Sequence, residues 1–195
     1  MRFELDELQL DARDTLRKLV LEDDVLPRLD EFGAFDPSLV AVTFEAIGYA
    51  GLVMPDDRYG DQPALAAAAQ LVGLAQRMLD MTVGYVKERK QFGVPVGSFQ
   101  AVKHQLADAV KEISFARPAV WRAAASLEVR DISMAKAMAS DAALLAGRKA
   151  LQCHGAIGYT EEADLHLFLK RSWALARSWG DASWHRDRIG RALGI

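Results

Sequence analysis

The stretch ALAAAAQLVGLAQRMLDMTVGYVKERK (residues 64–90) decides the fold, because it is a long run of strong helix formers. Alanine and leucine dominate this stretch, it contains no proline, and Gly73 is its first potential helix breaker. The composition therefore predicts one long helix from Ala64 to about Lys90.

Two further long helices are expected after this one. The apolar residues between positions 102 and 113 recur four, four and three residues apart, which is the spacing of one helix face. Pro118 interrupts the pattern, so we expect a bend near Phe115. The third helix is predicted over 132–152, where many alanines would let neighbouring helices approach closely.

Turn-forming residues separate the predicted helices. FGVPVGSF (92–99) is predicted to be a turn, and HGAIGYT (154–160) is predicted to be a glycine loop. Thr160 is followed by two glutamates, which predicts an N-cap for a fourth helix that runs to about Ala176. A terminal helix is expected over 181–193.

The segment MPDDRYGDQP (54–63) is the most turn-rich in the sequence and marks the predicted domain boundary. Apolar residues before it have helical spacing, so residues 1–61 are predicted to form an N-terminal helical segment. Residues 62–195 are predicted to form an up-and-down four-helix bundle, because their long helices are joined by short loops. The predicted fold class is therefore all-α.

Composition and charge argue against several classes of function. The 195 residues include 24 basic and 27 acidic side chains, for a net charge of -3, which favours neither nucleic acid nor a membrane surface as a partner. No apolar run approaches the roughly 20 residues of a membrane span. The single cysteine excludes an intrachain disulfide, and we expect a cytoplasmic protein. The four histidines lack metal-ligand spacing, so no metal site is predicted.

The segment YVKERKQFG (85–93) is the first candidate functional site. It places Arg89 in the last turn of the predicted helix. In one reading the arginine interacts with the helix dipole in solvent, and in the other its guanidinium binds a phosphate group. Spacing alone leaves both readings open.

The segment LQCHGAIGYT (151–160) is the second candidate. Gly155 either ends a helix or forms, beside Gln152, a backbone cradle for part of a large polar ligand. Cys153 is predicted to be a buried structural thiol. Three tryptophans five or six residues apart are either core residues or interface anchors. They are Trp173, Trp179 and Trp184.

Both candidate segments resemble the signature regions of the acyl-CoA dehydrogenase family. The resemblance lies in YVKERKQFGVPVGSFQAVKHQLAD (85–108) and LQCHGAIGYTEEADLHLFLKR (151–171). Residues 64–195 are similar to the C-terminal helical domain of that family. FELDELQLDARDTLRKL (3–19) and AIGYAGLVMPDDRYGD (46–61) resemble its N-terminal part.

The resemblance implies a flavoprotein with two parts missing. Family members use a glutamate to remove the α proton of an acyl-CoA thioester, and a hydride passes from the β carbon to FAD. Their middle β domain has no counterpart here, since no β-rich stretch lies between Asp61 and Ala64. Trp179 stands where most members have the glutamate, and Pro63 lies near the alternative position. Neither residue accepts a proton, so no catalytic residue is predicted in this chain.

The resemblance also implies half of an FAD site, because the helical domain of one subunit helps to bind the FAD of its neighbour. Arg89 and Gln91 would contact the pyrophosphate, with Phe92 packing behind them. Phe99 and Gln100 would contact the adenine side. Gln152 and Gly155 would support the adenosine, and Ala156 replaces the second glycine of that motif. The predicted cofactor-binding residues are Arg89, Gln91, Phe92, Phe99, Gln100, Gln152, Gly155 and Ala156.

These expectations lead to three hypotheses about function. The first is a non-catalytic subunit of a heteromeric acyl-CoA dehydrogenase. Its partner would be a full-length subunit that holds the acyl-CoA and shares the FAD. The second is a stand-alone minimal dehydrogenase that forms a homo-oligomer. The third is a helical interaction module that has lost flavin binding.

Overall fold

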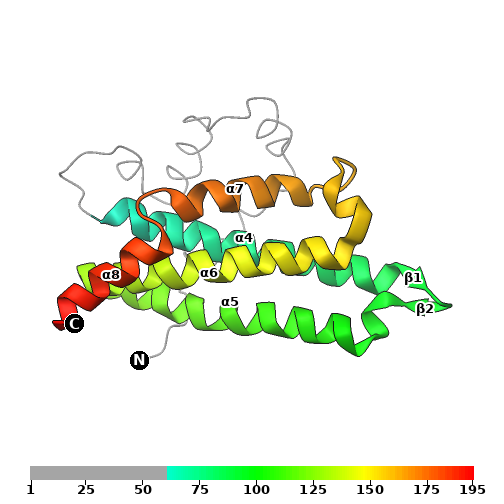
Figure 1. Ribbon diagram of the computed structural model, residues 1–195, viewed down its shortest axis with the longest axis horizontal. Helices are drawn as coiled ribbons and strands as arrows, with labels where there is room; N and C mark the ends of the chain where they lie inside the picture. The colour runs from blue at the N-terminus through cyan, green and yellow to red at the C-terminus, as the bar shows by residue number, and fades with distance from the viewer. Residues whose placement is uncertain (1–60) are drawn as a thin grey trace, which may run out of the picture. The chain divides into compact units, whose positions relative to one another are not determined.

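Long helices that lie side by side make up the computed structural model, which describes residues 61–195 (Figure 1). The long helices are α4 (Gln62–Glu88), α5 (Gln100–Ser126), α6 (Val129–His154) and α7 (Leu165–Arg177), and α8 (Ala182–Leu193) ends the chain. The predicted all-α class and the four-helix bundle are confirmed. The predicted boundaries of the first and third helices and of α8 fall close to the observed ones, and the second long helix lies where the apolar spacing placed it.

Helix α6 lies at the centre of this arrangement and contacts α5, α7 and α8. Its buried face consists mostly of alanine and serine, so its neighbours approach its backbone closely. Helix α4 joins them through two cross-helix hydrogen bonds. Arg117 of α5 donates to Gln76 at 2.9 Å, and Arg171 of α7 donates to Gln70 at 2.9 Å.

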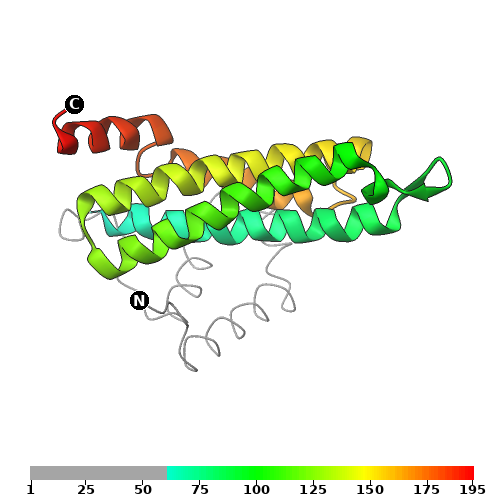
Figure 2. The ribbon, with the colours of Figure 1, turned by 90° about the horizontal axis from the view of Figure 1, so that it is seen from below.

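Short elements connect the helices at one end of the bundle. Between α4 and α5, β1 (Lys90–Gln91) pairs antiparallel with β2 (Val94–Pro95), and η2 (Val96–Ser98) follows. The predicted turn is therefore a small hairpin, which projects from the end of the bundle in both views (Figures 1 and 2). Its tip needs two successive residues with positive φ, 53° at Phe92 and 80° at Gly93.

The interruption predicted at Pro118 is not observed, and the bend predicted near Phe115 stays a prediction. The proline does lie within α5, but that helix is continuous from Gln100 to Ser126 and is not interrupted. A proline removes one backbone hydrogen bond from a helix, and the packing of a long helix against its neighbours offsets that loss.

The N-cap predicted at Thr160 is wrong. Thr160 ends η3 (Gly155–Tyr159), and its Oγ1 donates to the Ile157 carbonyl at 2.9 Å. Residues 161–164 form turns, and α7 begins only at Leu165. The threonine hydroxyl thus closes the preceding turn instead of accepting from a following helix, an alternative open to short polar side chains.

Glycine at position 147 permits the close contact between α6 and α7. A Cβ added there would lie 2.7 Å from Leu169 Cδ2, whereas one added at Gly73 in α4 would meet no atom within 4 Å. We expect Gly147→Val to lower the free energy of unfolding by about 1–3 kcal/mol through overpacking. Gly73→Ala should raise it by about 0.5–1 kcal/mol, since glycine in a helix is entropically unfavourable. Urea denaturation followed by circular dichroism measures both, and similar values for the two variants would contradict this packing.

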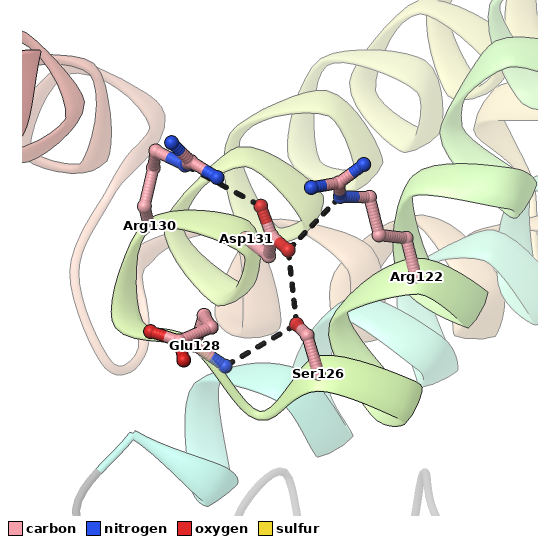
Figure 3. A network of polar contacts seen from close by, with 5 residues as sticks. All are labelled: Arg122, Ser126, Glu128, Arg130 and Asp131. Carbon is pink, nitrogen blue, oxygen red and sulfur yellow. Dashed lines mark hydrogen bonds and ion pairs between the residues drawn. The ribbon is translucent and has the colours of Figure 1, made fainter.

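A buried carboxylate fixes the junction of α5 and α6 (Figure 3). Asp131 accepts hydrogen bonds from Arg122 Nε and from Ser126 Oγ, both at 2.9 Å, and Arg130 Nε lies 3.5 Å away. Ser126 Oγ in turn accepts from the Glu128 backbone N–H at 3.3 Å. The connection between the two helices is therefore held by side chains from both of them.

This network predicts a dependence of stability on pH. Burial raises the pKa of Asp131, but the hydrogen bonds from Ser126 and Arg122 and the nearby positive charges outweigh burial, so the pKa lies below the ordinary value of 3.8. The unfolded chain therefore takes up this proton at a higher pH than the native protein does. We expect the contribution of Asp131 to be complete above about pH 5 and to be lost as the pH falls below 4. In urea titrations from pH 7 to 3, Asp131→Asn should lose less stability than the wild type, and equal losses would contradict the assignment.

No described helix is long and apolar enough to span a membrane.

The predicted helices before residue 61 lie outside the described residues. The N-terminal segment and its boundary at residue 61 therefore stay predictions.

Candidate functional site

The predicted cofactor-binding residues lie at one end of the bundle, where α4 and α6 end and α5 begins (Figures 1 and 2). All eight are solvent-exposed in the described part of the chain. A stacked pair of rings joins the two segments that carry them. The Tyr85 and His154 rings lie 4.5 Å apart at an interplanar angle of 17°. Two segments distant in sequence therefore meet at one surface.

Arg89 is held by its backbone, and its side chain is available to a ligand. Its N–H donates to the Tyr85 carbonyl at 2.8 Å, and its own carbonyl accepts from Val96 N–H at 2.8 Å. Within residues 61–195 the guanidinium forms no ion pair and no hydrogen bond. This fixed backbone and unpaired cation suit an anionic ligand supplied from outside the chain.

The hairpin presents aromatic and amide groups beside this arginine. Phe92 is 92% exposed and contacts Phe99 edge to face, with 6.2 Å between ring centroids. Gln91 Nε2 donates to the neighbouring Lys90 carbonyl, and Gln100 is the first residue of α5. Phe92 therefore projects into solvent. Packing of its ring against a cofactor stays a prediction.

The second segment turns sharply after α6. Gly155 ends that helix with φ 64° and ψ -138°, and its N–H donates to the Leu151 carbonyl, so it is the helix-ending glycine of the first reading. Glycine at position 158 permits a close approach, because a Cβ there would lie 3.0 Å from the His154 Cβ. Gln152 and Ala156 are exposed beside this turn. A glycine that ends a helix can also contact a ligand through its backbone, so the role of Gly155 in a backbone cradle stays a prediction.

Sequence reasoning missed the roles of Tyr85 and His154, although both lie inside the quoted segments. His154 is buried, and its Nδ1 lies 2.8 Å from the Ala150 carbonyl. This contact orients the ring for stacking on Tyr85. No periodic signal in the sequence pairs residues so far apart.

Cys153 is only partly buried, so the predicted buried thiol is observed in part. Burial raises the pKa of this thiol, and the nearby Lys149 charge offsets part of that effect. The thiol form therefore predominates at neutral pH, which disfavours reactivity as a nucleophile.

Trp179 lies at the opposite end of α7 from η3, in the turn before α8. The structure therefore does not bring this position together with the predicted FAD residues. The exposed fraction is 52% for Trp173, 41% for Trp179 and 46% for Trp184. These tryptophans are therefore not core residues, and the core reading is wrong. Their reading as interface anchors stays a prediction.

Comparisons with known proteins identify the family. Residues 61–194 match the family model described as "Acyl-CoA dehydrogenase, C-terminal domain". Acyl-CoA dehydrogenase IpdE2 of Mycolicibacterium smegmatis is 40% identical over 125 residues, a match that covers 64% of this chain and 40% of IpdE2. The probable acyl-CoA dehydrogenase YngJ of Bacillus subtilis is 37% identical over 138 residues, covering 68% of this chain and 36% of YngJ.

Solved structures agree with this assignment. The ChsE4-ChsE5 complex from Mycobacterium tuberculosis matches with a TM-score of 0.65 and 30% identity, over 69% of this chain and 38% of that chain. A glutaryl-coenzyme A dehydrogenase in complex with glutaryl-CoA matches with a TM-score of 0.66 and 32% identity, over 69% and 36%. The matched region is thus well under half of each relative. Because most of the sequence matches the C-terminal domain and the bundle agrees, the chain belongs to the acyl-CoA dehydrogenase family.

Proposed function

We propose that this chain is a non-catalytic subunit of a heteromeric acyl-CoA dehydrogenase and that it completes the FAD site of a full-length partner. The partner would supply the β domain, the catalytic glutamate and the acyl-CoA pocket. The reaction of the assembly would be the α,β-dehydrogenation of an acyl-CoA thioester, with FAD as hydride acceptor.

The exposed end of the bundle is the observation that carries this proposal. An arginine that pairs with no other residue of 61–195, exposed amides and exposed aromatic rings lie together there, and all of them are accessible to solvent. Exposed cationic and amide groups match the pyrophosphate and the ribose and adenine polar groups of a dinucleotide. If FAD is bound mainly by another chain, these groups provide contacts from the subunit that lies opposite.

Two of the similar proteins support a heteromeric flavoprotein. ChsE4-ChsE5 is a complex of two differently named chains, and PigA, 27% identical with a TM-score of 0.65, was solved with FAD. In this chain, Trp179 in place of a glutamate favours a partner that provides the base. The two alternatives to this proposal are a homo-oligomeric enzyme and a helical module that does not bind flavin.

The absorbance spectrum between about 350 and 500 nm distinguishes the three hypotheses, because that band belongs to the flavin itself. The chain is purified alone and after co-expression with full-length acyl-CoA dehydrogenase subunits encoded in the same genome. We expect the chain alone to be colourless and the complex to be yellow. A yellow chain without a partner would favour the homo-oligomer, and a stable but colourless complex would favour the flavin-free module.

A further inference from the structure

Lys136 is the largest fully buried side chain of the described region, and its ammonium has three hydrogen-bond acceptors. Its Nζ donates to Ser140 Oγ at 3.2 Å, to the Ala176 carbonyl at 3.2 Å and to the Gly180 carbonyl at 3.0 Å. Two of these acceptors are backbone groups at the end of α7 and in the following turn. One side chain of α6 therefore holds a segment that lies some 40 positions later in the chain.

That segment has an unusual backbone conformation. Trp179 has φ 61° and Gly180 has φ 92°, so a bulky residue adopts the left-handed conformation that glycine usually occupies. The carbonyl of Trp179 lies 3.0 Å from His185 Nε2, and the carbonyl of Gly180 accepts from Lys136. Two successive carbonyls of the turn are thus bound by two fully buried side chains.

We propose that Lys136 is a positioning residue, whose ammonium holds the Trp179–Gly180 turn in its left-handed conformation and thereby fixes the direction of the Trp179 indole. This inference does not depend on the proposed FAD role, because it concerns the other end of α7. Trp179 stands where the family resemblance places a catalytic carboxylate. The buried lysine therefore acts on the position at which this chain departs from its family.

Packing alone does not explain a lysine at this position. A methionine has a similar volume and would avoid the desolvation of an ammonium. Burial lowers the pKa of Lys136 to about 8, and the Asp181 charge offsets part of that shift. The ammonium is thus less favourable here than in water, while its three donors match the three acceptors around it. A lysine is therefore retained here, despite the unfavourable free energy of burying its ammonium, because it holds the turn in position.

The charged and titratable groups around the turn come from α8 and its cap. Asp181 carries the charge that acts on Lys136, and its Oδ1 accepts from the Trp184 N–H at 2.8 Å as the N-cap of α8. His185 of the same helix binds the Trp179 carbonyl.

The test is fluorine NMR of the full chain labelled with 5-fluorotryptophan, whose four tryptophans give four resonances. Trp179→Phe assigns the resonance of interest. We expect Lys136→Met to shift the Trp179 resonance and to broaden or split it, while the Trp121 resonance of α5 keeps its position. Lys149→Met is the matched control, because it removes a lysine from the same helix that pairs with Asp108, and it should leave Trp179 unchanged.

A folded Lys136→Met protein, judged by circular dichroism, with an unchanged Trp179 resonance would overturn the proposal. If that variant does not fold, the wild-type protein is titrated between pH 7.5 and 10, and the Trp179 resonance is followed. A shift of the Trp179 resonance with a midpoint near 8 supports the role of Lys136. A Trp179 resonance without an inflection in that range contradicts it.

Discussion

Replacement of Arg89 by alanine should weaken FAD binding by the complex of this chain with a full-length subunit by about 10- to 100-fold. A hydrogen bond to a charged group contributes about 1.5–3 kcal/mol, and about 1.4 kcal/mol corresponds to a factor of ten. The Arg89 side chain is exposed and pairs with no other residue in the described region. Its removal therefore leaves no unpaired partner behind, and any loss of affinity reports contact with the ligand.

The measurement is a fluorescence titration of the flavin-free complex with FAD. Lys111→Ala is the matched control, since it removes an exposed cation from α5 whose ion pair with Glu112 lies on the surface. We expect Lys111→Ala to keep the wild-type Kd within about twofold, in line with the small contribution of exposed charges. Equal Kd values for the wild type and Arg89→Ala would contradict contact between this arginine and the cofactor.

Replacement of Asp131 by alanine should lower the free energy of unfolding by about 2–3 kcal/mol. The substitution removes the acceptor of Ser126 and the buried partner of Arg122 (Figure 3). The Arg122 side chain is 59% exposed, so the loss of its partner destabilises the protein less than an unpaired, fully buried ion would. Urea denaturation followed by circular dichroism measures the change.

Asp141→Ala provides the comparison, because it breaks a pair between two exposed side chains, Asp141 and Arg186. Exposed ion pairs contribute about 0–1 kcal/mol. If the two aspartate variants lose the same stability, the network around Asp131 does not hold the junction of α5 and α6 as described.

Spacing in the sequence was sufficient to predict the helices of the bundle. Apolar residues at helical intervals and long alanine-rich stretches report which segments pack side by side, and these signals are local. The N-cap predicted at Thr160 was wrong, because its hydroxyl closes the turn before it instead of capping α7. Pro118 lies within a continuous α5, so the predicted interruption does not occur, while the predicted bend stays a prediction. In the first case a local hydrogen bond, and in the second the packing of a long helix, outweighed the intrinsic preference of one residue.

The candidate site was predictable only as two separate segments. They meet at the stacked rings of Tyr85 and His154, and no local pattern in the sequence pairs these residues. The same holds for Lys136 and the Gly180 carbonyl, which are brought together by the packing of α6 against α7. Polar contacts between distant segments follow from the fold, so a single sequence does not reveal them.

Photolabelling shows whether this chain touches an FAD that is held mainly by its partner. A flavin dinucleotide with an azide on the adenine ring is bound to the complex and irradiated, and mass spectrometry locates the labelled peptides. We expect label on this chain within the peptides that contain Phe99, Gln100 and Gln152. Label found on the partner alone, in a complex shown by its spectrum to be saturated with flavin, would contradict it.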